Sequence, residues 1–220
     1  MKIKVDIPTR LSEISLQQYQ KYLDLLETNK DNAEGDNLEH FLALKTLEIF
    51  CNIPYKTGMM LKVKDVNSAL YKITELLNHK PPLRMKYTLG DTTFGLIPKL
   101  DDMSFGEYID LDKYIVNWKD MHKAMAVLYR PIDAMIGDQY TIQEYKGDNY
   151  WDAMKHMPLD VVFSSLLFFY HLGIELSQIT LNYLSQQESS KDWHTILEKN
   201  GVTTSQFTTL VEETLGPMRM

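Results

Sequence analysis

Apolar side chains recur at helical spacing through most of the first 80 residues. Ser15 and Gln18 form a capping-box pattern, in which each side chain accepts from a free backbone N–H at the start of a helix. The apolar positions that follow predict helices over 16–26, 36–50 and 64–79. The link between the first two is short, so we expect them to pack as an antiparallel hairpin.

Two stretches alternate with a period of two instead. Residues 2–7 place isoleucine and valine on one face and charged residues on the other, which is typical of a short half-buried strand. Residues 84–97 alternate on both sides of Gly90-Asp91, and glycine at the first turn position predicts a type II′ hairpin. Because an isolated hairpin is only marginally stable in water, we expect the N-terminal strand to pair with it as the third strand of a small sheet.

The segment 103–131 carries a second capping box, Ser104 with Glu107. Two apolar helical faces follow and are interpreted as core packing, and the register slips at 116–117, so we expect two helices or one kinked helix. Pro131 ends the pattern, because proline disfavours the α conformation in the residue before it. The first face consists of Phe105, Tyr108 and Ile109, and the second of Trp118, Met121, Met125 and Leu128.

The C-terminal half is organised around one long apolar pattern. Residues 133–149 show little periodicity and are predicted as loop, and Tyr150, Trp151 and Met154 then indicate one short helix. From 159 to about 187 the chain is apolar on nearly every side, which indicates a central buried helix. Shorter helices are predicted over 193–199 and 203–215.

These patterns predict a mainly α fold. We expect a helical bundle around the long apolar helix, with a small antiparallel β element made of the N-terminal strand and the hairpin 84–97. The 220 residues suit a single domain, 1–220, in which 1–8 and 84–97 form a β-arm subdomain.

Composition narrows the functional classes. The net charge of −7 argues against a general nucleic-acid binder, because polyanions are repelled at long range. The single cysteine, Cys51, excludes an internal disulfide and is interpreted as a small buried hydrophobe. The apolar run 161–174 is too short to span a bilayer and the N-terminus lacks the apolar run of a signal peptide, so no membrane segment is expected.

No catalytic, cofactor-binding or metal-binding residue is predicted from the sequence. The six histidines are scattered singly, without the i, i+4 pairing of a zinc helix, and no phosphate-binding glycine loop is found. The acidic residues between 101 and 112 are the best candidates for paired carboxylates, yet their number favours a solvated flank or a complement to the helix dipole. We therefore expect no cofactor and no enzymatic activity.

One segment resembles a known class of proteins. GEYIDLDKYI is followed by W-x₂-MHKAMAVLYRPI, and then by a Trp-x-x-Met-x-x-x-Pro segment that leads into the long apolar helix. This pattern, mainly over 94–184, resembles the head–tail connector proteins, the neck or ring adaptors, of tailed bacteriophages of the crAss-like group. Known connectors of this kind are helical, carry a β-hairpin or extended arms, and form twelve-fold rings under the portal.

The resemblance implies a non-enzymatic virion protein. It would be made in the host cytoplasm, join the neck of the particle as a homo-oligomeric ring of twelve copies, and contact the portal protein and the next tail or ring protein. It would extend the DNA channel and contact DNA only while the DNA passes through that channel.

The assembly contacts are expected on projecting elements, because a ring subunit must reach its neighbour. These are the terminal strand, the hairpin and the tail 216–220. The basic residues of the strand and hairpin would share a face, which serves either as a solvated edge that prevents aggregation or as a contact for an acidic neighbour. The candidate contacts are Lys2, Lys4, Arg84, Lys86, Phe94, Leu96, Met218 and Met220.

Two alternatives stay open. The first is a tail-assembly chaperone, or another non-enzymatic morphogenesis protein, that binds a structural protein transiently and is then released. The second is a small helical enzyme or regulator with a pocket around His122, Tyr129 and Asp110.

Overall fold

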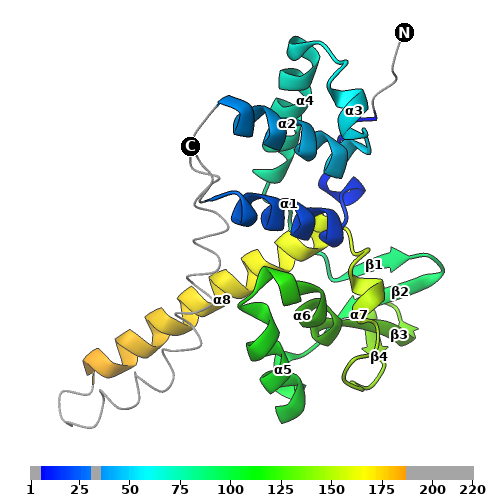
Figure 1. Cartoon of the computed structure of the whole chain (residues 1–220). Helices are drawn as coiled ribbons and strands as arrows, with labels where there is room; N and C mark the ends of the chain where they lie inside the picture. The colour runs from blue at the N-terminus through cyan, green and yellow to red at the C-terminus, as the bar shows by residue number, and fades with distance from the viewer. Residues whose placement is uncertain (1–5, 31–35, 187–220) are drawn as a thin grey trace. The chain divides into compact units, whose positions relative to one another are not determined.

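The computed structural model describes residues 6–30 and 36–186 (Figure 1). Their contacts divide the chain into two compact units. The first unit runs to His79 and includes Asp152–Asp160; the second comprises Lys80–Trp151 and the chain from Val161 onward. Each unit has buried apolar residues of its own. The expectation of a single domain stays a prediction.

The first unit is helical, as the apolar spacing predicts. The Ser15–Gln18 capping box is confirmed. The side-chain amide of Gln18 also donates to the backbone carbonyl of Ile49 over 2.8 Å. The start of the first long helix therefore lies against the end of the next, and the predicted antiparallel hairpin is confirmed. Its helices are η1 (Leu11–Glu13), α1 (Leu16–Thr28), α2 (Asp36–Cys51), α3 (Tyr55–Gly58) and α4 (Val63–Leu77).

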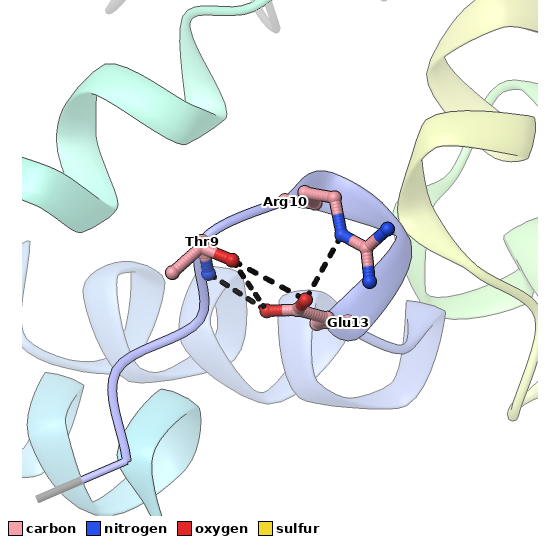
Figure 2. A network of polar contacts seen from close by, with 3 residues as sticks. All are labelled: Thr9, Arg10 and Glu13. Atoms are coloured by element: carbon pink, nitrogen blue, oxygen red, sulfur yellow. Dashed lines mark hydrogen bonds and ion pairs between the residues drawn. The ribbon is translucent and has the colours of Figure 1, made fainter.

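An exposed polar network lies at the start of η1 (Figure 2). The carboxylate of Glu13 accepts from the backbone N–H of Thr9 over 2.7 Å and from Nε of Arg10 over 3.0 Å. Both contacts favour the ionised form, and the Thr9 N–H contributes most to lowering the pKa of Glu13.

A returning segment completes the first unit. This segment, Asp152–Asp160, begins within the short helix α7 (Trp151–Met154). The backbone N–H of Leu16 donates to the carbonyl of Met157 over 2.9 Å, and that of Leu159 donates to Ile14 over 2.8 Å. The side chains of Met154 and Met157 are completely buried, so this segment belongs to the core of the first unit.

The second unit contains a four-stranded antiparallel sheet (Figure 1). The order is β1 (Lys86–Leu89), β2 (Thr92–Leu96), β3 (Tyr129–Ile136) and β4 (Gln139–Ile142). The predicted hairpin is confirmed: Gly90 has φ +57° and Asp91 does not adopt a positive φ, as a type II′ turn requires. The third strand is β3, and the predicted pairing with residues 2–7 is wrong for Asp6 and Ile7, which lie in no strand. Residues 2–5 lie outside the described residues.

Strands β3 and β4 replace the predicted helix end and loop. Pro131 lies inside β3, opposite Phe94, and the register shifts between Ile132 and Ala134. A proline cannot donate to a sheet ladder, and the shift in the β3–β4 pairing begins one residue after it. Strand β3, which contains Pro131, follows directly from the helix α6 (Met121–Leu128).

One face of the sheet is buried against helices of the same unit. Tyr87, Phe94, Leu96 and Tyr129 are each no more than 6% exposed. The hydroxyl of Tyr129 lies 2.7 Å from the hydroxyl of Ser165, which anchors the sheet to the long helix. The helices of this unit are η3 (Leu100–Asp102), α5 (Phe105–Ile115), η4 (Trp118–Asp120), α6 (Met121–Leu128) and α8 (Leu159–Gln186).

The prediction of a mainly α bundle around a long apolar helix is wrong. The fold is mixed α/β, with a four-stranded antiparallel sheet in the second unit. Helix α8 is buried only over its first turns, to Leu166, whereas Ile174 and Ile179 are 36% and 63% exposed. None of the helices in the described residues is long and apolar enough to cross a membrane. The helices predicted over 193–199 and 203–215 lie outside the described residues.

The predicted β-arm subdomain of 1–8 and 84–97 stays a prediction as a domain division, but its hairpin lies within the sheet. The hairpin 84–97 forms half of the sheet, pairs with β3, and buries Phe94 and Leu96 in its own unit. It is therefore part of a packed body and does not project as an arm.

Candidate functional site

The orientation of α5 is fixed by a buried ion pair. Ser104 and Glu107 form the predicted capping box, with the Ser104 N–H donating to Oε2 of Glu107 over 2.7 Å. The other carboxylate oxygen accepts from Nη2 of Arg130 in β3 over 2.6 Å, and the two side chains are only 7% and 10% exposed. A buried charge needs such a partner, so Glu107 must face the sheet. Tyr114 and Ile115 are buried on the same helix.

This orientation turns an apolar face of α5 outward. Phe105 is 78% exposed, and Tyr108 and Ile109 are each 48% exposed, so the prediction that they pack in the core is wrong. Residues three, four and seven positions apart lie on one side of a helix. We call this surface the α5 stripe; it consists of Phe105, Tyr108, Ile109, Asp112 and Val116.

The stripe contains one incompletely satisfied acidic group. Oδ1 of Asp112 is buried and has no hydrogen-bond partner among the described residues. Such an oxygen is costly, and the cost falls when a donor or a cation approaches the carboxylate. Two further acidic residues, Asp101 and Asp102, are exposed just before the helix. The stripe is therefore an apolar surface with acidic character.

A second exposed apolar surface lies in the first unit, between α3 and α4. Met59, Met60 and Val63 are 66%, 77% and 74% exposed. We call it the α3–α4 patch; with its exposed lysines it consists of Lys56, Met59, Met60, Lys62, Val63 and Lys64.

Backbone contacts hold the α3–α4 patch in place. The N–H groups of Met59 and Met60 donate to Tyr55 and Thr57 over 3.1 and 3.0 Å. The turn lies close to α2, since a Cβ on Gly58 would stand 3.0 Å from Cδ2 of Leu44. The apolar side chains of this turn are thus directed outward by a fixed backbone.

A cleft of about 610 Å³ opens in the second unit, lined by residues of 97–107, by Arg130 and by residues of 140–145. Its polar side chains are largely bonded to the protein itself. Tyr145 donates to Asp110 over 2.6 Å, and burial, followed by the hydrogen bond to Asp110, raises the pKa of Tyr145 well above its usual value. Tyr140 donates to the carbonyl of Leu96 over 2.7 Å.

The described lining of this cleft contains no nucleophile held by a base. The hypothetical pocket around His122, Tyr129 and Asp110 does not coincide with it, because none of the three residues lines the cleft. Tyr129 is fully buried, and its hydroxyl donates to the carbonyl of Arg84. Asp110 instead accepts from Tyr145.

Among the described residues, no group of three or more histidine, cysteine or acidic side chains could hold a metal ion. Cys51 is buried, and burial raises the pKa of its thiol to about 11, which disfavours the reactive thiolate.

Only some of the residues predicted as assembly contacts are exposed. Phe94 and Leu96 are 2% exposed, so they face their own core in this structure. Arg84 is exposed and its backbone N–H donates to Ser164, whereas Lys86 is half-buried, with Nζ 5.6 Å from the ring centre of Tyr140. A contact role for Arg84 and Lys86 stays a prediction. The remaining candidates lie outside the described residues: Lys2, Lys4, Met218 and Met220.

Sequence reasoning missed both exposed surfaces. The α5 stripe was visible as helical spacing, but its spacing alone does not tell which side faces the core. The α3–α4 patch had a compositional signal, since Met59-Met-Leu-Lys-Val-Lys64 mixes apolar and basic residues.

Comparison with known proteins adds no relative. No protein-family model, no curated protein and no solved structure matches the chain.

Proposed function

We propose that the chain is a non-enzymatic structural subunit of a tailed-phage particle. It acts as a head-to-tail adaptor: twelve copies form a ring between the portal and the tail, extend the DNA channel and present a platform to the next tail protein. The mature protein belongs to the neck of the virion.

The α5 stripe is the observation that carries this proposal. Three large apolar side chains stand on the outward side of one helix, with exposures between 48% and 78%. Contiguous exposed apolar side chains of this kind mark surfaces that another protein covers. An assembly subunit needs such a surface, whereas a protein that acts alone gains nothing from it.

The resemblance to connector proteins supports the same function. The matching residues form α5, η4, α6 and the start of β3, and they pack together in one unit. Met121, Met125 and Leu128 are completely buried there. These residues therefore specify a fold core, which fits a structural protein.

The ring contact does not depend on a projecting hairpin, because β1 and β2 are built into the sheet. It rests instead on exposed surfaces in each unit. A closed ring of identical subunits uses heterologous contacts, so each subunit needs two different surfaces. The α5 stripe and the α3–α4 patch are two such surfaces.

Quantitative mass spectrometry of purified phage particles tests the function. An adaptor is present in mature particles at one copy per portal subunit. Presence in infected cells together with absence from purified particles would reject the adaptor and identify a tail-assembly chaperone instead.

A further inference from the structure

We propose that neighbouring copies of this chain join through a heterologous contact, in which the α3–α4 patch of one copy packs on the α5 stripe of the next. This inference rests on the proposed function for the need of a ring contact, and it names the two surfaces that make it.

The apolar side chains of the two surfaces suit each other. Phe105 and Tyr108 provide large rigid rings, the side-chain type most enriched at the centres of interfaces. Met59 and Met60 are unbranched and adapt their shape to such rings, with favourable sulfur–aromatic contacts. Packing one surface on the other removes both from water.

The charges of the two surfaces are opposite. Residues 55–64 contain three lysines and no acidic residue, and all three lysines are exposed. The stripe carries Asp112, whose Oδ1 has no hydrogen-bond partner among the described residues. Asp101 and Asp102 are exposed just before the helix, and lysines of the neighbouring copy placed beside the acidic residues of this surface form ion pairs with them.

Each surface also has one neighbouring residue of the opposite charge: Lys113 beside the α5 stripe and Asp65 beside the α3–α4 patch. Lys113 follows Asp112, but its Nζ lies 5.1 Å from the ring centre of Tyr114, which is buried on another side of α5. Asp65 is exposed and follows the patch in the first turn of α4.

Charge also decides against symmetric pairing. Stripe on stripe would oppose Asp112 to its own copy, and patch on patch would oppose three lysines to three lysines. Like charges at an interface are unfavourable and suppress the wrong pairing. A patch-on-stripe contact is head-to-tail, and repetition of a head-to-tail contact produces a ring when the rotation closes.

Complementation between two variants tests the contact. The stripe variant is Tyr108→Ser with Ile109→Asp, and the patch variant is Met60→Asp with Val63→Asp. All four residues are exposed, so both variants should fold. We expect the wild-type chain to self-associate, and each variant alone to be monomeric, its association weakened by about tenfold or more.

The mixture of the two variants gives the decisive result. Each variant keeps the surface that the other has lost, so an equimolar mixture should form dimers of one stripe variant and one patch variant, and nothing larger. Recovery on mixing also shows that both variants are folded. The measurement is sedimentation velocity or native mass spectrometry of the full chain.

Two matched controls and three outcomes complete the test. Ile136→Asp and Tyr71→Ser change exposed side chains outside both surfaces and should leave association unchanged. The contact is overturned by a wild-type chain that stays monomeric up to about 0.5 mM, by a patch variant that still dimerises alone, or by a mixture that stays monomeric. If the chain is nevertheless found in phage particles, the adaptor function survives while this contact fails.

Discussion

Tyr140 in β4 lies across β3 and covers Gly95 in β2. A Cβ on Gly95 would clash with Cε2 of this ring and stand 2.9 Å from its Cδ2. The hydroxyl of Tyr140 donates to the carbonyl of Leu96 over 2.7 Å, so the ring is held against β2 and has little freedom to move aside. The glycine is therefore required by the tyrosine, and the pair ties the fourth strand to the second.

Gly95→Ala should destabilise the protein by about 1–3 kcal/mol, because the new methyl group overpacks the site. In a Tyr140→Ala background the same substitution should cost far less, since the obstructing ring is gone. Chemical denaturation of the four proteins of this double-mutant cycle measures the coupling. Additive effects would contradict the contact.

Because the ion pair between Glu107 and Arg130 is buried, breaking it should lower the free energy of unfolding. Arg130→Met leaves the carboxylate of Glu107 buried without its cation and should cost about 3–5 kcal/mol. Adding Glu107→Gln should recover part of this loss, because glutamine is neutral and still accepts from the N–H of Ser104. Chemical denaturation again provides the measurement.

The exposed pair Arg10–Glu13 is the matched control for this experiment, with side-chain exposures of 75% and 36%. Arg10→Met should change stability little, because water screens the pair and solvates both partners. Equal losses at the two ion pairs would show that burial does not set the difference.

Local features of this fold were predictable from sequence because their causes are local. The Ser15 and Ser104 capping boxes and the Gly90 turn depend on residues within four positions of each other, and all three are confirmed. The buried face of α6 follows from helical spacing alone.

The sheet was only half predictable. A second Gly-Asp pair, Gly137-Asp138, forms the β3–β4 turn, and Gly137 has φ +60° like its counterpart Gly90. It was missed because Pro131 suggested the end of a helix and the start of a loop. Pro131 pairs with Phe94 of β2, a strand far away in sequence, so its place in the sheet is not visible in the local pattern.

The candidate site was less predictable still. The spacing of Phe105, Tyr108 and Ile109 is equally consistent with an inward and an outward face. The choice is made by Glu107, which is drawn to Arg130 on another element. Contacts of this kind become visible only when the tertiary structure is known.

Tyr145 provides a test of the cleft by titration. Its pKa is raised, first by burial and then by the hydrogen bond to Asp110, so it should ionise well above the usual pH. Asp110→Asn should lower this pKa but leave it raised, because burial remains the larger cause. NMR of tyrosine Cζ resonances in the folded protein measures the change.

The sign of the linked stability effect follows from the same shift. The folded state holds the Tyr145 proton more tightly than the unfolded state, so the contribution to stability is complete below the unfolded pKa of about 10 and is lost as pH rises above it. A Tyr145 resonance that titrates together with that of the unfolded chain would contradict the partly buried hydrogen bond to Asp110.

The native mass of the purified chain, measured alone and with its portal protein, tests the central claim most directly. The account predicts self-association of the 25.7 kDa chain and, with the portal present, a ring of twelve copies at twelve times that mass, about 308 kDa, in addition to the portal. A chain that remains at 25.7 kDa both alone and in the presence of the portal would contradict it.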